Sequence, residues 1–185
     1  PVLRRIYAGR GVQSSQELDR SLQSLASPVK LPDVQRAAGR LADAVEHQQK
    51  IMIVGDFDAD GATAVTLCVK ILRDFGAEHV EFLVPNRFEY GYGLSPEIVD
   101  LANTSQPDLI VTVDNGVSSV AGVDRARERG IDVIVTDHHL PGAELPRALA
   151  IVNPNLPEAD FPSRNMAGVG VAYYVLGVVR TTLRD

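Results

Sequence analysis

The sequence predicts an α/β domain with a parallel sheet of about five strands and helices on both faces. Three observations predict this fold class. Short apolar runs alternate with longer stretches that have helical spacing, which is typical of strands joined by helical crossovers. Gly, Pro and cap residues mark many of the boundaries between them. Acidic and histidine residues follow the apolar runs directly, at the end of the strand where parallel sheets bind ligands.

The composition is that of one globular domain. The chain has 185 residues, of which 45% are hydrophobic and 23% are charged. No apolar run approaches the ~20 residues that span a bilayer, and polar residues follow Arg4 and Arg5, where a signal peptide would need an apolar segment. The single cysteine, Cys68, falls at helical spacing with apolar neighbours, so we expect it in the core. We therefore expect a cytoplasmic protein that does not enter a membrane.

The acidic balance of the chain bears on its partners. A formal net charge of −6 argues against a protein that coats nucleic acid by bulk attraction. A local basic groove is compatible with this charge, so charge alone leaves the partner open.

The elements of the first half follow in order. Residues 1–32 are mixed in composition and predict an irregular amino-terminal segment packed on a domain that spans residues 33–185. Asp33 is a good helix cap, and the apolar spacing of Val34–Gln49 predicts a helix. The next elements are a strand, a helix that Gly76 ends, and a second strand, at Ile51–Val54, Gly61–Phe75 and His79–Val84.

The second half continues the alternation. Ser95 and Pro96 are a cap and a first helical residue, and they open a helix to about Asn103. The remaining elements are a strand at Leu109–Val113, a helix at Val117–Arg129 that Gly130 ends, strands at Ile131–Thr136 and Leu149–Val152, and a final helix at Ala167–Arg184. This alternation implies right-handed crossovers and a parallel sheet.

Metal-competent side chains follow three of the predicted strands. In chain order they are Asp56, Asp58 and Asp60, then Asp114, then Asp137, His138 and His139. Because the carboxyl ends of parallel strands share one edge of a sheet, we expect these side chains to lie close together. Carboxylates gathered at a buried edge repel one another without a cation, and Asp and His bind the divalent ions used in hydrolytic chemistry. The sequence therefore predicts a metallophosphoesterase.

The acidic loop admits three interpretations. As a calcium loop it has the opening spacing, but the twelfth position, where a bidentate Glu is needed, is Leu67. As a phosphatase with an aspartate nucleophile, Asp58 attacks and Asp60 is the acid, which leaves the two histidines without a role. As a binuclear metal site, alternate Asp residues on a tight turn supply two neighbouring ions.

Five segments together resemble the DHH phosphoesterase superfamily. They are Gly55-Asp56-Phe57-Asp58-Ala59-Asp60-Gly61, Val84-Pro85-Asn86-Arg87 with Gly91-Tyr92-Gly93-Leu94, Val113-Asp114-Asn115-Gly116, Thr136-Asp137-His138-His139, and Asn153-Pro154-Asn155 with Ala167-Gly168-Val169-Gly170. The resemblance covers nearly the whole chain. The second segment favours the bacterial exonucleases specific for single-stranded DNA over the pyrophosphatases and cyclic-dinucleotide phosphodiesterases of the superfamily.

The resemblance implies a hydrolase with two divalent cations, Mn²⁺ in preference to Mg²⁺. It would degrade single-stranded DNA from the 5′ end to 5′-mononucleotides, in recombination and repair. By motif, Asp56 and Asp58 hold one ion, Asp60 and His138 hold the other, and Asp114 bridges both ions. A water between the ions would be the nucleophile. His139 contacts the scissile phosphate, and Asp137 orients the histidines. The residues expected to contact substrate are Asn86, Arg87, Gly91, Tyr92, Gly93, Asn115, Asn153, Asn155, Gly168 and Gly170.

The family pattern continues beyond Asp185. One more metal-binding Asp, a hinge helix, a second core domain and an oligonucleotide-binding domain are expected there, so we expect little activity from these 185 residues alone. The resemblance also implies a monomer with single-strand-binding protein and helicase partners. Two alternatives stay open, namely another DHH-type phosphodiesterase or pyrophosphatase acting on small nucleotides, and an inactive module that binds metal or partners.

Overall fold

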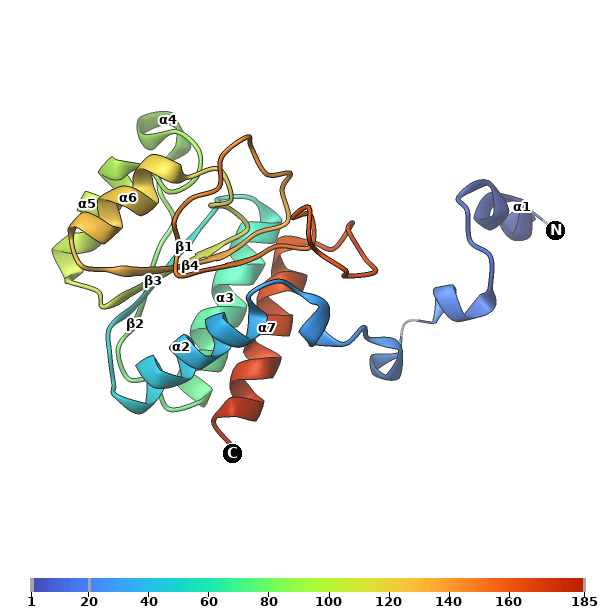
Figure 1. Cartoon of the computed structure of the whole chain (residues 1–185), viewed down its shortest axis with the longest axis horizontal. Helices are drawn as coiled ribbons and strands as arrows, with labels where there is room; N and C mark the ends of the chain where they lie inside the picture. Colours follow the sequence, from blue (N-terminus) through green and yellow to red (C-terminus); the bar gives the residue numbers. More distant parts are fainter. Residues whose placement is uncertain (1, 20, 185) are drawn as a thin grey trace.

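A five-stranded, entirely parallel sheet forms the centre of the molecule in a computed structural model that describes residues 2–19 and 21–184 (Figure 1). The strand order is β2-β1-β3-β4-β5, which confirms the predicted fold class. The strands span Ile51–Gly55 (β1), Val80–Leu83 (β2), Leu109–Val113 (β3), Asp132–Thr136 (β4) and Ala150–Val152 (β5). All five residues of β1 and of β3 are buried, so these central strands are continuous apolar runs rather than alternating ones.

Helices cover both faces of the sheet (Figure 1). One apolar cluster packs α2 (Val34–Glu46), α3 (Ala59–Asp74) and α7 (Gly168–Thr182) against one face. A second cluster packs α5 (Pro96–Ala102) and α6 (Val120–Glu128) against the other face. Cys68 is buried in the first cluster, and burial raises the pKa of its thiol to about 12, so it is a packing residue at neutral pH.

Local hydrogen bonds shift some helix starts from the predicted positions. Helix α3 begins before Gly61, because Asp58 caps it by accepting a hydrogen bond from the Gly61 backbone N–H at 2.9 Å. Helix α6 begins at Val120 and not at Val117, whose N–H donates to Asp137 at 2.8 Å. Helix α5 begins as predicted, with the Ser95 hydroxyl accepting from the Ile98 N–H.

Asp33 does not cap α2 with its side chain, contrary to the sequence prediction. Its backbone is left-handed, with φ of 53°, and its carboxylate accepts from the Ile151 N–H at 3.0 Å. Asp33 therefore ties the start of α2 to β5, a contact between residues far apart in sequence.

The amino-terminal segment is irregular as predicted, but most of it is not packed on the domain. Helix α1 (Val2–Gly9) has no buried residue, and this end of the chain extends away from the sheet (Figure 1). The short 3₁₀ turns η1 (Ser15–Leu18), η2 (Leu22–Ser24) and η3 (Pro28–Lys30) follow. Contact with the body begins near Leu25, which lines a cavity with residues of α7, and Leu31 is the first described residue that is buried.

Two short elements complete the connections. Helix α4 (Arg87–Tyr90) lies in the segment after β2, and the 3₁₀ turn η4 (Asn103–Ser105) follows α5. Among the described residues, no helix combines the length and the apolar character that crossing a bilayer requires.

Candidate metal centre

The predicted metal-competent residues lie at the carboxyl edge of the sheet. The strand order changes direction between β1 and β3. The chain runs from β1 to β2 on one side of β1, and then crosses to β3 on its other side. Loops that leave the sheet at such a switch point diverge and leave room for a ligand. Asp56 follows β1, Asp114 follows β3, and Asp137 follows β4, so all three acidic segments reach this edge.

Asp114 is the most constrained of these residues. Its φ is +61°, a left-handed conformation that residues other than glycine adopt only when the surroundings hold them there. The Asp114 N–H donates to the Thr136 carbonyl at 3.0 Å. The Asn115 amide donates to the carbonyls of Val54 and Val113, which fixes the next residue to β1 and β3. The Asp114 side chain is consequently presented from a rigid strand end.

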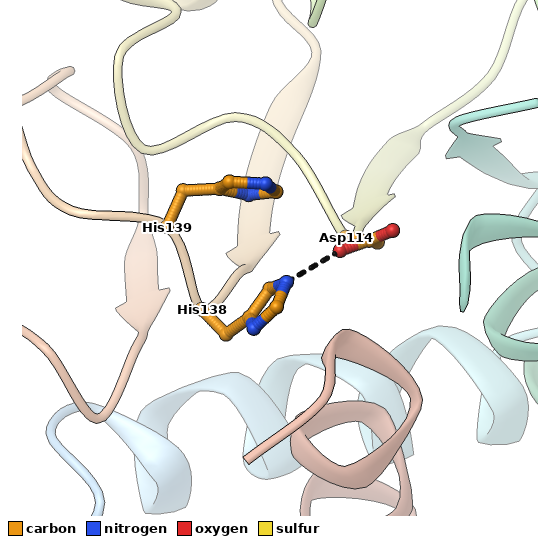
Figure 2. A group of neighbouring side chains, drawn as sticks. All are labelled: Asp114, His138 and His139. Atoms are coloured by element: carbon orange, nitrogen blue, oxygen red, sulfur yellow. Dashed lines mark ion pairs between the residues drawn. The ribbon is translucent and has the colours of Figure 1, made fainter. Parts of the chain in front are cut away.

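The Asp114 carboxylate is buried next to an imidazole. Only 2% of Asp114 is exposed, and its Oδ1 lies 3.0 Å from Nε2 of His138 (Figure 2). That contact is not aligned as a hydrogen bond, and Oδ1 accepts none from the described residues. A buried carboxylate oxygen that lacks a hydrogen bond is costly unless a cation compensates it.

Burial, followed by the charge of Asp60, raises the pKa of Asp114 to about 7. The charge of Asp58 raises it further, whereas His138 lowers it. The metal-free protein therefore holds the Asp114 proton more tightly than an ordinary carboxyl group does. A divalent cation would reverse this preference, because it would favour the ionised form.

Asp114, His138 and His139 form one compact group of donors. One ligand atom from each lies within 4.8 Å of the others, and the two imidazole rings are 4.6 Å apart (Figure 2). The expected role of His139 is contact with phosphate. Its ring nitrogen nevertheless lies as close to the Asp114 and His138 donors as a metal ligand would. His138 also lies 3.7 Å from Oδ2 of Asp60, measured from Nε2.

Asp137 holds the histidine segment in place through hydrogen bonds. Its Oδ1 accepts from the backbone N–H groups of His138 and His139, at 2.7 and 3.0 Å, and from Nδ1 of His139 at 2.7 Å. Its Oδ2 accepts from Val117. Burial lowers the pKa of His139, but the hydrogen bond and charge of Asp137, with the charges of Asp114 and Asp56, raise it by more. Asp137 thus fixes the ring orientation and favours protonation.

Asp60 is shared between two helices. It lies in the first turn of α3, and its Oδ2 and Oδ1 accept from the N–H groups of Gly168 and Val169, at 2.7 and 2.8 Å, at the start of α7. An anion at a helix amino terminus is stabilised by the unpaired N–H groups and by the helix dipole. Asp60 therefore joins α3 to α7 beside Asp114.

The rest of the acidic loop is also bonded to backbone. Asp58 caps α3, and Oδ1 of Asp56 accepts from the Phe57 N–H at 2.7 Å. The prediction that Asp58 and Asp60 share a tight turn is wrong, because α3 begins at Ala59 and places Asp60 in its first turn. That helix also rules out the calcium-loop interpretation, since the residues from Ala59 onward are helical and cannot wrap an ion.

The expected substrate residues are those of the connection after β2, three asparagines, and two glycines near the start of α7. Tyr92 reaches the centre: its hydroxyl donates to the Asp114 carbonyl at 3.2 Å and lies 3.2 Å from Nδ1 of His139. Gly91 and Gly93 flank it with positive φ. Asn86 is exposed and bonds the Phe88 N–H at the start of α4, while the side chain of Arg87 lies outside the described part of the structure.

Three of the expected substrate residues are asparagines whose side chains donate to backbone carbonyls. Asn115 and Asn153 are buried, and Asn153 donates to the His139 carbonyl at 2.9 Å. Asn155 donates to the His138 carbonyl at 2.6 Å. The structure thus gives these side chains contacts with backbone, and Asn153 and Asn155 hold the histidine segment from behind. Sequence reasoning missed this, although both follow an apolar run as the histidines do.

Of the two expected glycines, Gly168 packs against Asp114, whereas Gly170 packs against Met166. A Cβ on Gly168 would lie 2.6 Å from Oδ1 of Asp114, which leaves no room for a side chain. A Cβ on Gly170 would lie 2.6 Å from Cγ of Met166, a flexible side chain.

The fold and the site define an α/β domain that gathers carboxylates and imidazoles at its topological switch point, a class suited to holding divalent cations. Residues 50–184 match the family model described as "DHH family, N-terminal domain". The chain belongs to the DHH family.

Individual relatives agree with this assignment. The chain is 56% identical over 185 residues to the single-stranded-DNA-specific exonuclease RecJ of Escherichia coli, covering all of this chain and 32% of that protein. It is 40% identical over 158 residues to RecJ of Bacillus subtilis, covering 85% of this chain and 20% of that protein. The chain thus spans about a third or less of these curated relatives.

Solved structures agree as well. The crystal structure of RecJ with Mn²⁺ from Thermus thermophilus has a TM-score of 0.78 and 32% identity, covering 96% of this chain and 24% of that one. A second exonuclease RecJ bound to manganese has a TM-score of 0.77 and 34% identity, covering 86% of this chain and 40% of that one.

Proposed function

We propose that this chain is the metal-binding domain of a RecJ-type exonuclease that hydrolyses single-stranded DNA. The observation that carries the proposal is the buried Asp114 carboxylate, whose Oδ1 lies 3.0 Å from His138 and accepts no hydrogen bond from the described residues. The identity of 56% to a relative named as a single-stranded-DNA-specific exonuclease supports the substrate. Degradation from the 5′ end to mononucleotides, in repair and recombination, belongs to this proposal.

The donor set fits divalent cations. Asp114, His138 and Asp60 would hold one ion, and Asp56 and Asp58 would contribute to a second, with Asp114 shared. Mixed carboxylate and imidazole donors suit Mn²⁺ somewhat better than Mg²⁺. Related RecJ structures are described as complexes with each of these ions. When bound, such cations acidify a water molecule and neutralise charge that develops on a phosphate.

The remaining residues support that chemistry. Asp137 accepts a hydrogen bond from the Nδ1–H of His139, which fixes the ring and favours its cationic form. A cationic imidazole at this edge would bind a phosphate oxygen and stabilise negative charge there. Asn153 and Asn155 hold the carbonyls of the two histidines, so the rings keep their places when substrate binds.

The test is exonuclease activity in the complete protein. We expect Asp114→Ala and His138→Ala each to abolish release of mononucleotides from 5′-labelled single strands with Mn²⁺, while circular dichroism stays unchanged. Near-normal activity of a folded Asp114→Ala protein would refute the assignment.

The cytoplasm is the proposed site of action, since chromosomal DNA lies there in bacteria. A monomeric state and association with single-strand-binding protein or a helicase stay predictions.

A further inference from the structure

Tyr92 connects three segments of the candidate metal centre. It belongs to the connection after β2, its hydroxyl donates to the carbonyl of Asp114 after β3, and its ring packs edge-on against His139 after β4. The ring centroids of Tyr92 and His139 are 5.7 Å apart at an interplanar angle of 78°. Half of Tyr92 is exposed, so this contact lies at the rim of the site.

The Asp114 backbone needs this support. Its left-handed φ of +61° is uncommon for residues other than glycine, although Asp adopts it more readily than most. Strand β4 holds the N–H through the Thr136 carbonyl. The Tyr92 hydroxyl is the side-chain donor to the Asp114 carbonyl, so together they hold both sides of the residue.

The backbone that follows Tyr92 is anchored to the body of the domain. Leu94, two residues later, is buried, and its N–H donates to the Ser119 hydroxyl at 3.0 Å. A Cβ on Gly93 would lie 2.9 Å from the same hydroxyl. These contacts fix the backbone next to Tyr92, so the hydrogen bond from its hydroxyl can hold the Asp114 carbonyl in place.

We propose that Tyr92 is a positioning residue for the metal site: its hydroxyl fixes the Asp114 peptide and thereby sets the affinity for the divalent cation. The inference deepens the proposed function and depends on it. It differs from a role in which the Tyr92 ring stacks on a base, because a stacking role needs the ring and not the hydroxyl.

The substitution Tyr92→Phe separates the two roles, since it keeps the ring and removes the hydroxyl. We expect it to weaken Mn²⁺ binding by this chain about fivefold, which corresponds to about 1 kcal/mol for one hydrogen bond, as measured by calorimetry without DNA. Tyr90→Phe is the matched control, because Tyr90 ends α4 in the same connection after β2 and packs on the second apolar cluster. It should leave Mn²⁺ affinity unchanged. An affinity unchanged by Tyr92→Phe would overturn the proposal.

A second measurement needs no metal. The Asn115 N–H belongs to the same peptide as the Asp114 carbonyl, so its ¹H–¹⁵N resonance reports on the Tyr92 contact directly. We expect this resonance to move in Tyr92→Phe and to stay in place in Tyr90→Phe. No movement would overturn the inference even if the chain bound no Mn²⁺. Absence of Mn²⁺ binding by the unaltered chain would instead contradict the proposed function.

Discussion

Gly168 and Asp114 pack so closely that a single methyl group would not fit between them. A Cβ on Gly168 would lie 2.6 Å from Oδ1 and 2.7 Å from Cβ of Asp114. The first residue of α7 is therefore in contact with the residue that follows β3, and the size of residue 168 sets the position of the buried carboxylate.

Gly168→Ala should displace Asp114. We expect a loss of about 1–3 kcal/mol in the free energy of unfolding, from overpacking, together with weaker Mn²⁺ binding. Gly177→Ala is the control in the same helix, because a Cβ there meets nothing within 4 Å. The control should raise stability by up to about 1 kcal/mol, since alanine favours helices. Denaturant unfolding and calorimetry measure both effects, and equal behaviour of the two variants would contradict this packing argument.

Divalent cations should stabilise the domain. A ligand that binds only the folded state adds about 2.7 kcal/mol at a free concentration 100 times its dissociation constant. We therefore expect the melting temperature to rise with millimolar Mn²⁺ and to fall again with a chelator. His47→Ala, at an exposed position on another part of the surface, should keep this response, whereas Asp114→Ala should lose it. A melting temperature indifferent to Mn²⁺ would contradict the proposed centre.

The metal-free protein should become less stable as the pH rises. The pKa of Asp114 is raised to about 7 from an ordinary 3.8, so the folded state binds its proton more tightly than the unfolded state does. This contribution to stability is fully present below about pH 4 and is lost as the pH rises through about 7. Asp114→Asn carries no such proton, so the difference between the two proteins isolates the effect. Parallel stability curves from pH 4 to pH 8 would show that Asp114 has an ordinary pKa.

The 185-residue chain alone should show little exonuclease activity. It spans 32% of the length of the Escherichia coli relative, and the family resemblance leads us to expect a further carboxylate ligand. A misplacement of about 1 Å in a reacting group can cost on the order of 100-fold in rate. Equal rates of mononucleotide release by this chain and by the complete protein, at equal concentrations with Mn²⁺, would show that the site is already complete.

The sequence predicted the central strands β1 and β3 well because they are buried. The Leu109–Val113 strand has the predicted bounds, because the apolar run is buried over its whole length and polar residues mark both of its ends. The starts of α3 and α6 were less predictable, because hydrogen bonds to Asp58 and Asp137 determine them. Such bonds depend on where a side chain points, and spacing alone does not give this.

The candidate site shows the same division. Metal-competent residue types at strand ends predicted which edge of the sheet carries the site. The sequence did not predict that His139 would lie within 4.8 Å of the Asp114 and His138 donors, or that Asn153 would face a backbone carbonyl. Those features arise from the packing of loops that are remote in sequence.

Asp60 bonds the N–H of Gly168 across 108 positions of the chain. A contact of this separation forms late when a protein folds from its amino terminus, since α7 must be made and docked before the bond can exist. Before α7 docks, Asp60 lacks the hydrogen bond from Gly168, and Asp114 lacks the packing contact with the same glycine. During synthesis on the ribosome, the contact between Asp60 and the start of α7 can therefore form only after residues 168 and 169 have emerged.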